Sequence, residues 1–125
     1  VGVSLGTLGW VAMREEAWDR ARERLGESLE VRQEIGDKGG SAWCLERLAE
    51  IAVADGQSEK AVRLLAAAAA LRISIGSVID PADHATYQDQ LAALRTELGG
   101  SRFGTLWDEG HRLSVEQAIA YALET

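Results

Sequence analysis

The sequence predicts an all-α protein built from repeated helical hairpins. Three observations lead to this prediction: an alanine- and leucine-rich stretch at 61–76, a second copy of its pattern at 21–36, and the lack of alternating, strand-like segments. Across 61–76, apolar residues recur three and four positions apart, as they do on one face of a helix. Because one helical hairpin cannot bury its apolar face alone, two copies indicate a repeat architecture.

Length and composition suit one soluble helical domain. The chain has 125 residues, one proline and a net charge of −7, and an acidic surface repels phosphate backbones, so we expect no direct nucleic-acid contact by this segment. No apolar run is long enough to span a membrane. Cys44, the single cysteine, cannot form an internal disulfide, which is consistent with a reducing cytoplasm. The chain begins at Val1 rather than at a methionine, so we expect it to be a C-terminal fragment of a longer protein.

A shift of 40 residues aligns the two copies. The matched pairs are mostly small or apolar: Leu5 with Leu45, Leu8 with Leu48, Ala12 with Ala52, Ala21 with Ala61, Leu25 with Leu65, Arg32 with Arg72, Ile35 with Ile75, and Gly36 with Gly76. We therefore expect one unit at 1–39, a second at 40–79 and a divergent C-terminal cap at 80–125, all within a single domain.

Each unit is predicted to contain two helices, A and B. They cover about 3–15 and 17–35 in the first unit, and about 41–54 and 58–75 in the second. Glycines at 36 and 76 stand where a left-handed C-cap is required, and the glycine pair at 39–40 is expected to lie in the connection between units. The predicted core stripe of the first helix B consists of Trp18, Ala21, Leu25, Ser28, Arg32 and Ile35.

Three further helices are predicted to end the array. The first is capped by Asp80, has Pro81 at its first position and runs to about 98. A short helix follows at about 102–109, and the last begins with a capping box at 114–117. The residues expected to pack inward are Tyr87, Leu91, Leu94, Leu98, Phe103, Trp107, Val115, Ala118, Ile119 and Ala122.

The two units resemble the tetratricopeptide repeat. The residues that carry the resemblance are Leu8-Gly9, Ala12, Ala21, Leu25 and Ser28, then Leu48-Ala49, Ala52, Ala61, Leu65 and Ala68. The spacing of 40 differs from the usual repeat of about 34 residues, and the closing proline is missing. The resemblance implies a right-handed superhelix of helical hairpins that acts as a non-catalytic interaction module.

The second half of the chain resembles the C-terminal end of large bacterial regulators. The similar segments are LLAAAAALRISIG, DPADHATYQDQLAALRTELG and WDEGHRLSVEQAIAYALE. In such proteins, which include LuxR-type transcriptional regulators and some fused to adenylate cyclase modules, an NTPase module precedes a helical sensor region. The resemblance implies a cytoplasmic signalling role.

In tetratricopeptide arrays, residues of helix A that avoid the core line a groove that binds partners. Carried over to this sequence, they are Val3, Gly6, Trp10 and Met13 in the first unit and Trp43, Glu46, Glu50 and Val53 in the second. Their spacing of three and four places each set on one helix face, away from the predicted core stripe. Exposed aromatics often mark interaction surfaces, so the two tryptophans are the expected anchors. Alternatively, they pack against preceding repeats or a second copy of the chain.

No pattern indicates a catalytic, cofactor or metal site. His84 lies near two aspartates and His111 near one, but neither group supplies enough ligands for a structural metal. Cys44 is expected to be a small buried residue, because no motif connects it to a histidine. The glycine-rich segment 36–40 lacks the Lys-Ser/Thr ending of a phosphate loop.

Two functions therefore stay open, and a third is disfavoured. The chain is either a module that binds a protein, a peptide, a small effector or a neighbouring domain in its groove, or a self-association domain. Self-association would bury Trp10 and Trp43 in a symmetric dimer. An enzyme would require acids and histidines from distant helices to converge.

Overall fold

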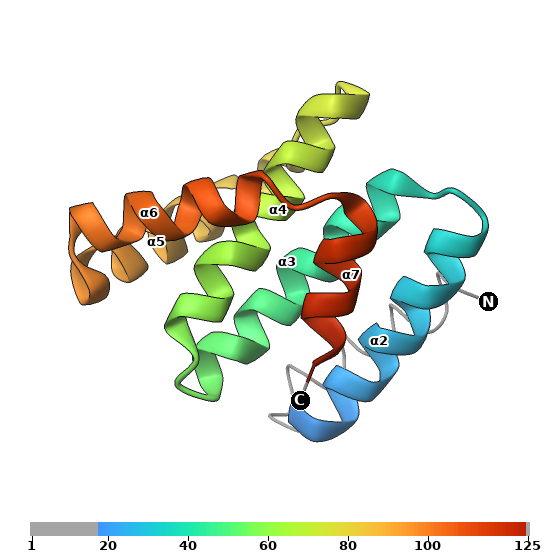
Figure 1. The fold of residues 1–125 in the computed structure, drawn as a ribbon, viewed down its shortest axis with the longest axis horizontal. Helices are drawn as coiled ribbons and strands as arrows, with labels where there is room; N and C mark the ends of the chain where they lie inside the picture. Colours follow the sequence, from blue (N-terminus) through green and yellow to red (C-terminus); the bar gives the residue numbers. More distant parts are fainter. Residues whose placement is uncertain (1–17, 125) are drawn as a thin grey trace.

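The structure is a computed structural model that describes residues 18–124, and these form six α-helices (Figure 1). Their bounds are Trp18–Glu34 (α2), Lys38–Ala54 (α3), Ser58–Ile75 (α4), Pro81–Leu98 (α5), Gly100–His111 (α6) and Val115–Leu123 (α7). No strand occurs within 18–124, so the predicted all-α class is confirmed. The predicted helix at 3–15 lies outside the described residues.

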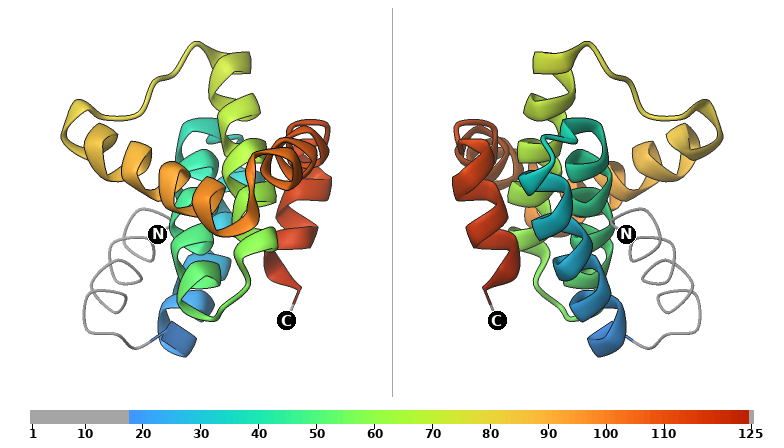
Figure 2. Two further views of the ribbon diagram at one scale, coloured as in Figure 1. Left: turned by 90° about the vertical axis from the view of Figure 1, so that its left-hand side faces the viewer. Right: turned by 90° about the vertical axis from the view of Figure 1, so that its right-hand side faces the viewer.

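The helices are arranged around a layer formed by α2, α3 and α4, which run up and down beside one another (Figure 1). Helix α6 packs against α4, and α7 contacts all three helices of the layer. Helix α5 contacts α4 and α6 and lies on the opposite side of the layer from α7 (Figure 2). Much of α5 is consequently exposed, and Leu94 is its one fully buried residue.

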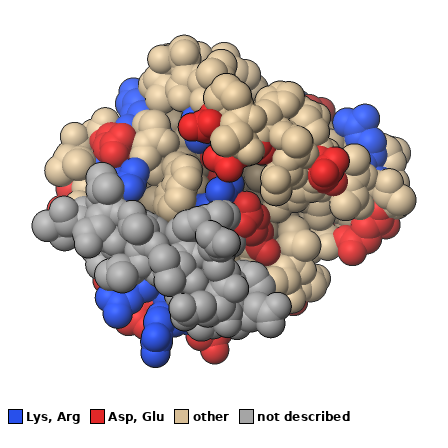
Figure 3. Space-filling view, turned by 180° about the vertical axis from the view of Figure 1, so that it is seen from behind, with Lys and Arg blue, Asp and Glu red and all other residues tan. Residues whose placement is uncertain are grey.

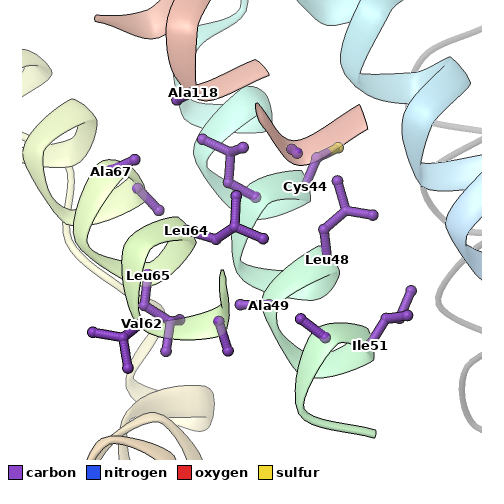
Figure 4. Close-up of a cluster of buried hydrophobic side chains, with 14 of the residues drawn as sticks. Cys44, Leu48, Ala49, Ile51, Val62, Leu64, Leu65, Ala67 and Ala118 are labelled. Atoms are coloured by element: carbon purple, nitrogen blue, oxygen red, sulfur yellow. The ribbon is translucent and has the colours of Figure 1, made fainter. Parts of the chain in front are cut away.

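The core fills the space between α2, α3 and α4. Its largest completely buried side chains include Leu25 and Leu29 of α2, Leu45 of α3, and Leu64 and Leu65 of α4. Burying each such leucine stabilises the fold by about 1.5–3 kcal/mol. Figure 4 shows part of this core, with side chains from α3, α4 and α7. The alanines at 66–68 are buried, so α4 packs closely against its neighbours along its alanine-rich middle.

Three glycine turns with the same geometry end α2, α3 and α4. Their glycines have positive φ angles: 74° at Gly36, 76° at Gly56 and 68° at Gly76. In each turn, the residue after the glycine donates its N–H to a carbonyl five residues earlier: Asp37 to Arg32 (2.8 Å), Gln57 to Ala52 (2.8 Å), and Ser77 to Arg72 (2.9 Å). The predicted left-handed glycines at 36 and 76 are therefore confirmed. A hydrogen-bonded helix end of this kind requires a residue that tolerates positive φ.

Helix α3 begins earlier than predicted, at Lys38 instead of Ser41. The carboxylate of Asp37 accepts a hydrogen bond of 2.9 Å from the N–H of Gly40 and so caps the helix. The prediction that the glycine pair lies in a connection is therefore wrong, since both glycines belong to the first turn. A Cβ at Gly40 would overlap the guanidinium of Arg32 and the carboxylate of Asp37, so the close packing of these two side chains requires glycine there.

One predicted core residue is exposed. Ile35 is 71% exposed, so placing it on the buried stripe was wrong, and Ile75, its match forty positions on, is 39% exposed. Each directly precedes a capping glycine, and the last turn of α4 extends past the other helices (Figure 1). The rest of the predicted stripe of α2 is buried, at Ala21, Leu25, Ser28 and Arg32. The side chain of Trp18 lies outside the described set.

The C-terminal helices begin as their sequence predicts. Asp80 caps α5 by accepting the N–H of Ala82 at 2.9 Å, and Pro81 follows at the first position. The capping box of Ser114 and Gln117 is present at the start of α7. Helix α6 is longer than predicted, since it covers Gly100–His111, and the rings of Phe103 and Trp107 stack with centroids 5.9 Å apart.

Helix α6 approaches the backbone of α4 at Gly110. A Cβ there would overlap the carbonyl oxygen of Arg63 and lie 2.7 Å from its Cα. Backbone atoms cannot move aside as a flexible side chain can, so we predict that Gly110→Ala lowers the free energy of unfolding by about 2–3 kcal/mol. Urea denaturation followed by circular dichroism measures this loss.

Gly104→Ala is the matched control in the same helix. A Cβ at Gly104 would meet nothing within 4 Å, so the substitution should stabilise the fold by about 0.5–1 kcal/mol through helix propensity. Equal effects of the two substitutions would show that the contact between α6 and α4 is looser than described.

Candidate partner-binding site

A hollow of about 800 Å³ lies between α3 and α5, and we call it the α3–α5 hollow. The connection at 77–80 borders it, while α2 and α4 contribute one arginine each. The residues that matter for its chemistry are Trp43, Glu46, Arg47 and Glu50 on α3, Asp83 and Tyr87 on α5, Arg32 and Arg72. Figure 3 views the molecule from the side of α5, where acidic and basic side chains are interspersed over the described surface.

A buried ion pair joins α3 to α4 beside the hollow. Glu46, only 3% exposed, accepts two hydrogen bonds of 2.7 Å from Nε and Nη2 of Arg72. The Nη1 atom of the same arginine donates to Ser77 Oγ at 3.0 Å and to the carbonyl of Val78 at 3.2 Å. Arg72 therefore connects α3, the end of α4 and the segment that leads to α5.

Trp43 is half-buried, and its ring is flanked by two arginines. The guanidinium carbon of Arg47 lies 5.5 Å from the ring centroid, and that of Arg32 lies 5.9 Å away. Cation–π contacts at these distances hold the indole in place while part of it stays accessible.

Two carboxylates lie on opposite walls of the hollow, Glu50 on α3 and Asp83 on α5. Arg47 pairs with Glu50 at 3.2 Å. Burial nevertheless raises the pKa of Glu50; Arg47 lowers it, and the negative charges of Asp83 and Glu46 raise it further. Tyr87 is half-buried, and burial followed by the charge of Glu46 raises the pKa of its hydroxyl.

The predicted groove residues are placed as follows. Trp43, Glu46 and Glu50 line the α3–α5 hollow, although Glu46 is committed to Arg72. Val53 is 40% exposed and lies outside the lining, near the end of α3. Four further residues, Val3, Gly6, Trp10 and Met13, lie outside the described residues. That these side chains bind a partner stays a prediction.

The wall formed by α5 was missed in the sequence, although a signal for it exists. Forty positions after Trp43, Glu46 and Glu50 stand Asp83, Thr86 and Gln90, and all three line the hollow. Applying the repeat shift once more would have placed them on the same face of a third helix A. The divergence of their side chains hid the relation.

The described residues offer no metal site. Among residues 18–124, no three histidine, cysteine, aspartate or glutamate side chains are grouped to hold an ion. Cys44 is buried as predicted, with Sγ 3.6 Å from Ser28 Oγ, and burial raises the pKa of its thiol. No helix within the same range is both long and apolar enough to cross a membrane.

Breaking the buried ion pair should destabilise the protein strongly. We predict that Glu46→Gln lowers the free energy of unfolding by about 3 kcal/mol, because the guanidinium of Arg72 then stays buried without its counter-charge. Chemical denaturation measures the change.

The exposed pair of Arg102 and Glu59, 3.1 Å apart, provides the matched control. Glu59→Gln should cost less than about 1 kcal/mol, because solvent screens the charges. A loss at Glu46 no larger than this would contradict the structural importance of the buried pair.

Glu50 should make stability depend on pH. Its folded-state pKa lies above the ordinary value of 4.5, so its contribution to stability is complete below pH 4.5 and is lost as pH rises through the raised pKa. We therefore expect Glu50→Gln to gain stability relative to the natural chain as pH rises from 4.5 towards 7. Urea unfolding of both proteins across this range tests the sign of this change. A free energy of unfolding of Glu50→Gln that falls relative to that of the natural chain as pH rises would contradict the prediction.

Comparison with known proteins agrees with the repeat geometry. The tetratricopeptide repeat family profile matches residues 1–74. This chain is 38% identical, over 102 residues that make up 82% of its length, to proteins named as HTH-type transcriptional regulators. They are Mb0914c of Mycobacterium bovis, and MT0914 and Rv0890c of Mycobacterium tuberculosis. The chain spans only 12% of the length of each relative. No solved structure gives a significant match. The family match covers more than half of the sequence, and the chain therefore belongs to the tetratricopeptide repeat family.

Proposed function

We propose that this chain is a protein-interaction module of a bacterial transcriptional regulator, and that a segment of a protein partner binds in the α3–α5 hollow. Tetratricopeptide repeats generally mediate protein–protein interaction, which gives the class of function. The observation that carries the proposal is that Trp43 and Tyr87, both half-buried, line the same hollow from α3 and α5. Partly accessible, well-held aromatics are typical anchors of protein interfaces.

The regulator context is supported by the names of the relatives and by the sequence segments near the C-terminus. We place the chain in a LuxR-type or NTPase-linked regulator of the cytoplasm, where binding in the hollow would be passed to other modules. A non-catalytic role agrees with the repeat fold. The net charge of −7 favours a protein partner over nucleic acid for this segment.

Self-association is the second candidate function. It is supported by exposed apolar side chains near the ends of α2 and α4, among which Ile73 is 72% and Val78 80% exposed. Exposed apolar patches mark interfaces. Light scattering after size-exclusion chromatography at two concentrations tests it: a dimer that Ile73→Lys or Val78→Lys dissociates would support self-association, and a monomer at both concentrations would contradict it.

Selection of peptides tests the main proposal. A random twelve-residue peptide library is displayed and panned on the immobilised chain, and each recovered peptide is titrated by fluorescence anisotropy. We expect Trp43→Ala and Tyr87→Ala each to weaken binding by about tenfold or more, as for interface anchors.

Tyr121→Ala is the matched control, because Tyr121 is also half-buried but belongs to α7, away from the hollow. Circular dichroism confirms that each variant is folded. Peptides that bind the Trp43→Ala and Tyr87→Ala variants as tightly as they bind the natural chain would contradict this site. So would peptides whose binding is lost only with Tyr121→Ala.

A further inference from the structure

The charges that line the α3–α5 hollow do not balance. Each lining arginine already has an acidic partner: Arg72 has Glu46, Arg47 has Glu50 at 3.2 Å, and Arg32 has Asp37 at 3.5 Å. Asp37 itself is not part of the lining, but Asp80 and Asp83 are. Four carboxylates therefore face three guanidinium groups among the described lining residues, so this part of the lining carries a net negative charge.

The excess negative charge is concentrated between Glu50 and Asp83. Asp80 is engaged in capping α5, and Glu46 is held by both of its oxygens. Glu50 is partly buried, with 22% of its side chain exposed. Burial raises the pKa of the Glu50 carboxyl most, and the negative charge of Asp83 raises it further. A cation placed between these two carboxylates would be attracted to both, since partial burial weakens screening by water.

The surroundings of this acidic position suit a long basic side chain. Tyr87 is half-buried one helical turn after Asp83 on the same α5 wall, and its ring provides an apolar surface for methylene groups or a guanidinium plane. Val78 also lines the hollow and is 80% exposed. An apolar side chain next to a basic one would therefore find a surface to cover.

We infer that the α3–α5 hollow selects a protein segment in which a lysine or arginine neighbours an apolar residue, with the basic group lying between Glu50 and Asp83. This inference rests on the proposed function and specifies the chemistry of its partner. An acidic segment is disfavoured, because it would have to compete with the acids that already bind all three arginines.

The panned peptides test this inference directly. We expect lysine and arginine to be enriched over the input library, and replacement of the basic residue in the tightest peptide by glutamine to weaken binding about tenfold. The double variant Glu50→Gln/Asp83→Asn should weaken the same peptide about tenfold and should bind the basic and glutamine peptides equally.

Asp89→Asn is the control, since Asp89 is an exposed acid of α5 outside the lining. This substitution should leave the affinity for the peptide within about twofold of that of the natural chain, because salt screens a distant exposed charge. Circular dichroism and urea unfolding of the double variant establish that it is folded under the binding conditions, so that a loss of binding does not reflect unfolding.

The outcomes separate the two claims. Peptides that depend on Trp43 but are acidic or neutral, or that bind the double variant unchanged, would overturn the basic-segment inference and leave the proposed function standing. If no recovered peptide depends on Trp43 or Tyr87, both the proposed function and the inference fail.

Discussion

The pairing of Arg72 with Glu46 is the interaction on which the α3–α5 hollow depends. Two hydrogen bonds of 2.7 Å join the helices α3 and α4 at a nearly solvent-free position. The remaining bonds of the guanidinium go to Ser77 and Val78, so the same group holds the segment that leaves α4. The position of the α5 wall, and hence the shape of the hollow, follows from where this segment is held.

The equivalent arginine one repeat earlier has a related but different role. Arg32 donates to Ser28 Oγ at 3.0 Å and pairs with Asp37, which stands forty positions before Ser77. There the next helix begins at Lys38, directly after the capping residue. After Gly76, in contrast, the chain continues through an irregular segment before α5 begins at Pro81. This longer connection lets α5 stand apart from α3. The same turn geometry therefore leads to close packing of α2 and α3 after Gly36, and to a hollow between α3 and α5 after Gly76.

Much of the fold could be predicted because it depends on local chemistry. The bounds of α4, the left-handed glycines, the capping box and the buried alanine and leucine stripe all follow from helix periodicity and cap preferences. The resemblance to tetratricopeptide arrays, together with the helical spacing, placed Trp43, Glu46 and Glu50 on one face of α3, and all three line the hollow. The early start of α3 was missed although its cap is local, because the glycine pair at 39–40 was interpreted as a connection rather than as the first turn after Asp37. The path of α5 was not predictable, because it depends on the contact of Arg72 with Glu46, which is distant in the sequence. In the sequence, Glu46 and Arg72 are only two charged residues 26 positions apart.

The central claim is that the hollow between α3 and α5 receives the partner, and paramagnetic relaxation measures this most directly. A panned peptide carrying a nitroxide label is titrated into ¹⁵N-labelled protein, and the broadening of each signal reports its distance from the label. The account predicts the strongest broadening at the indole N–H of Trp43 and at the amides of 83–90. Trp107, half-buried on α6, serves as the internal reference. Broadening that is strongest at Trp107 or along α7 would contradict the account.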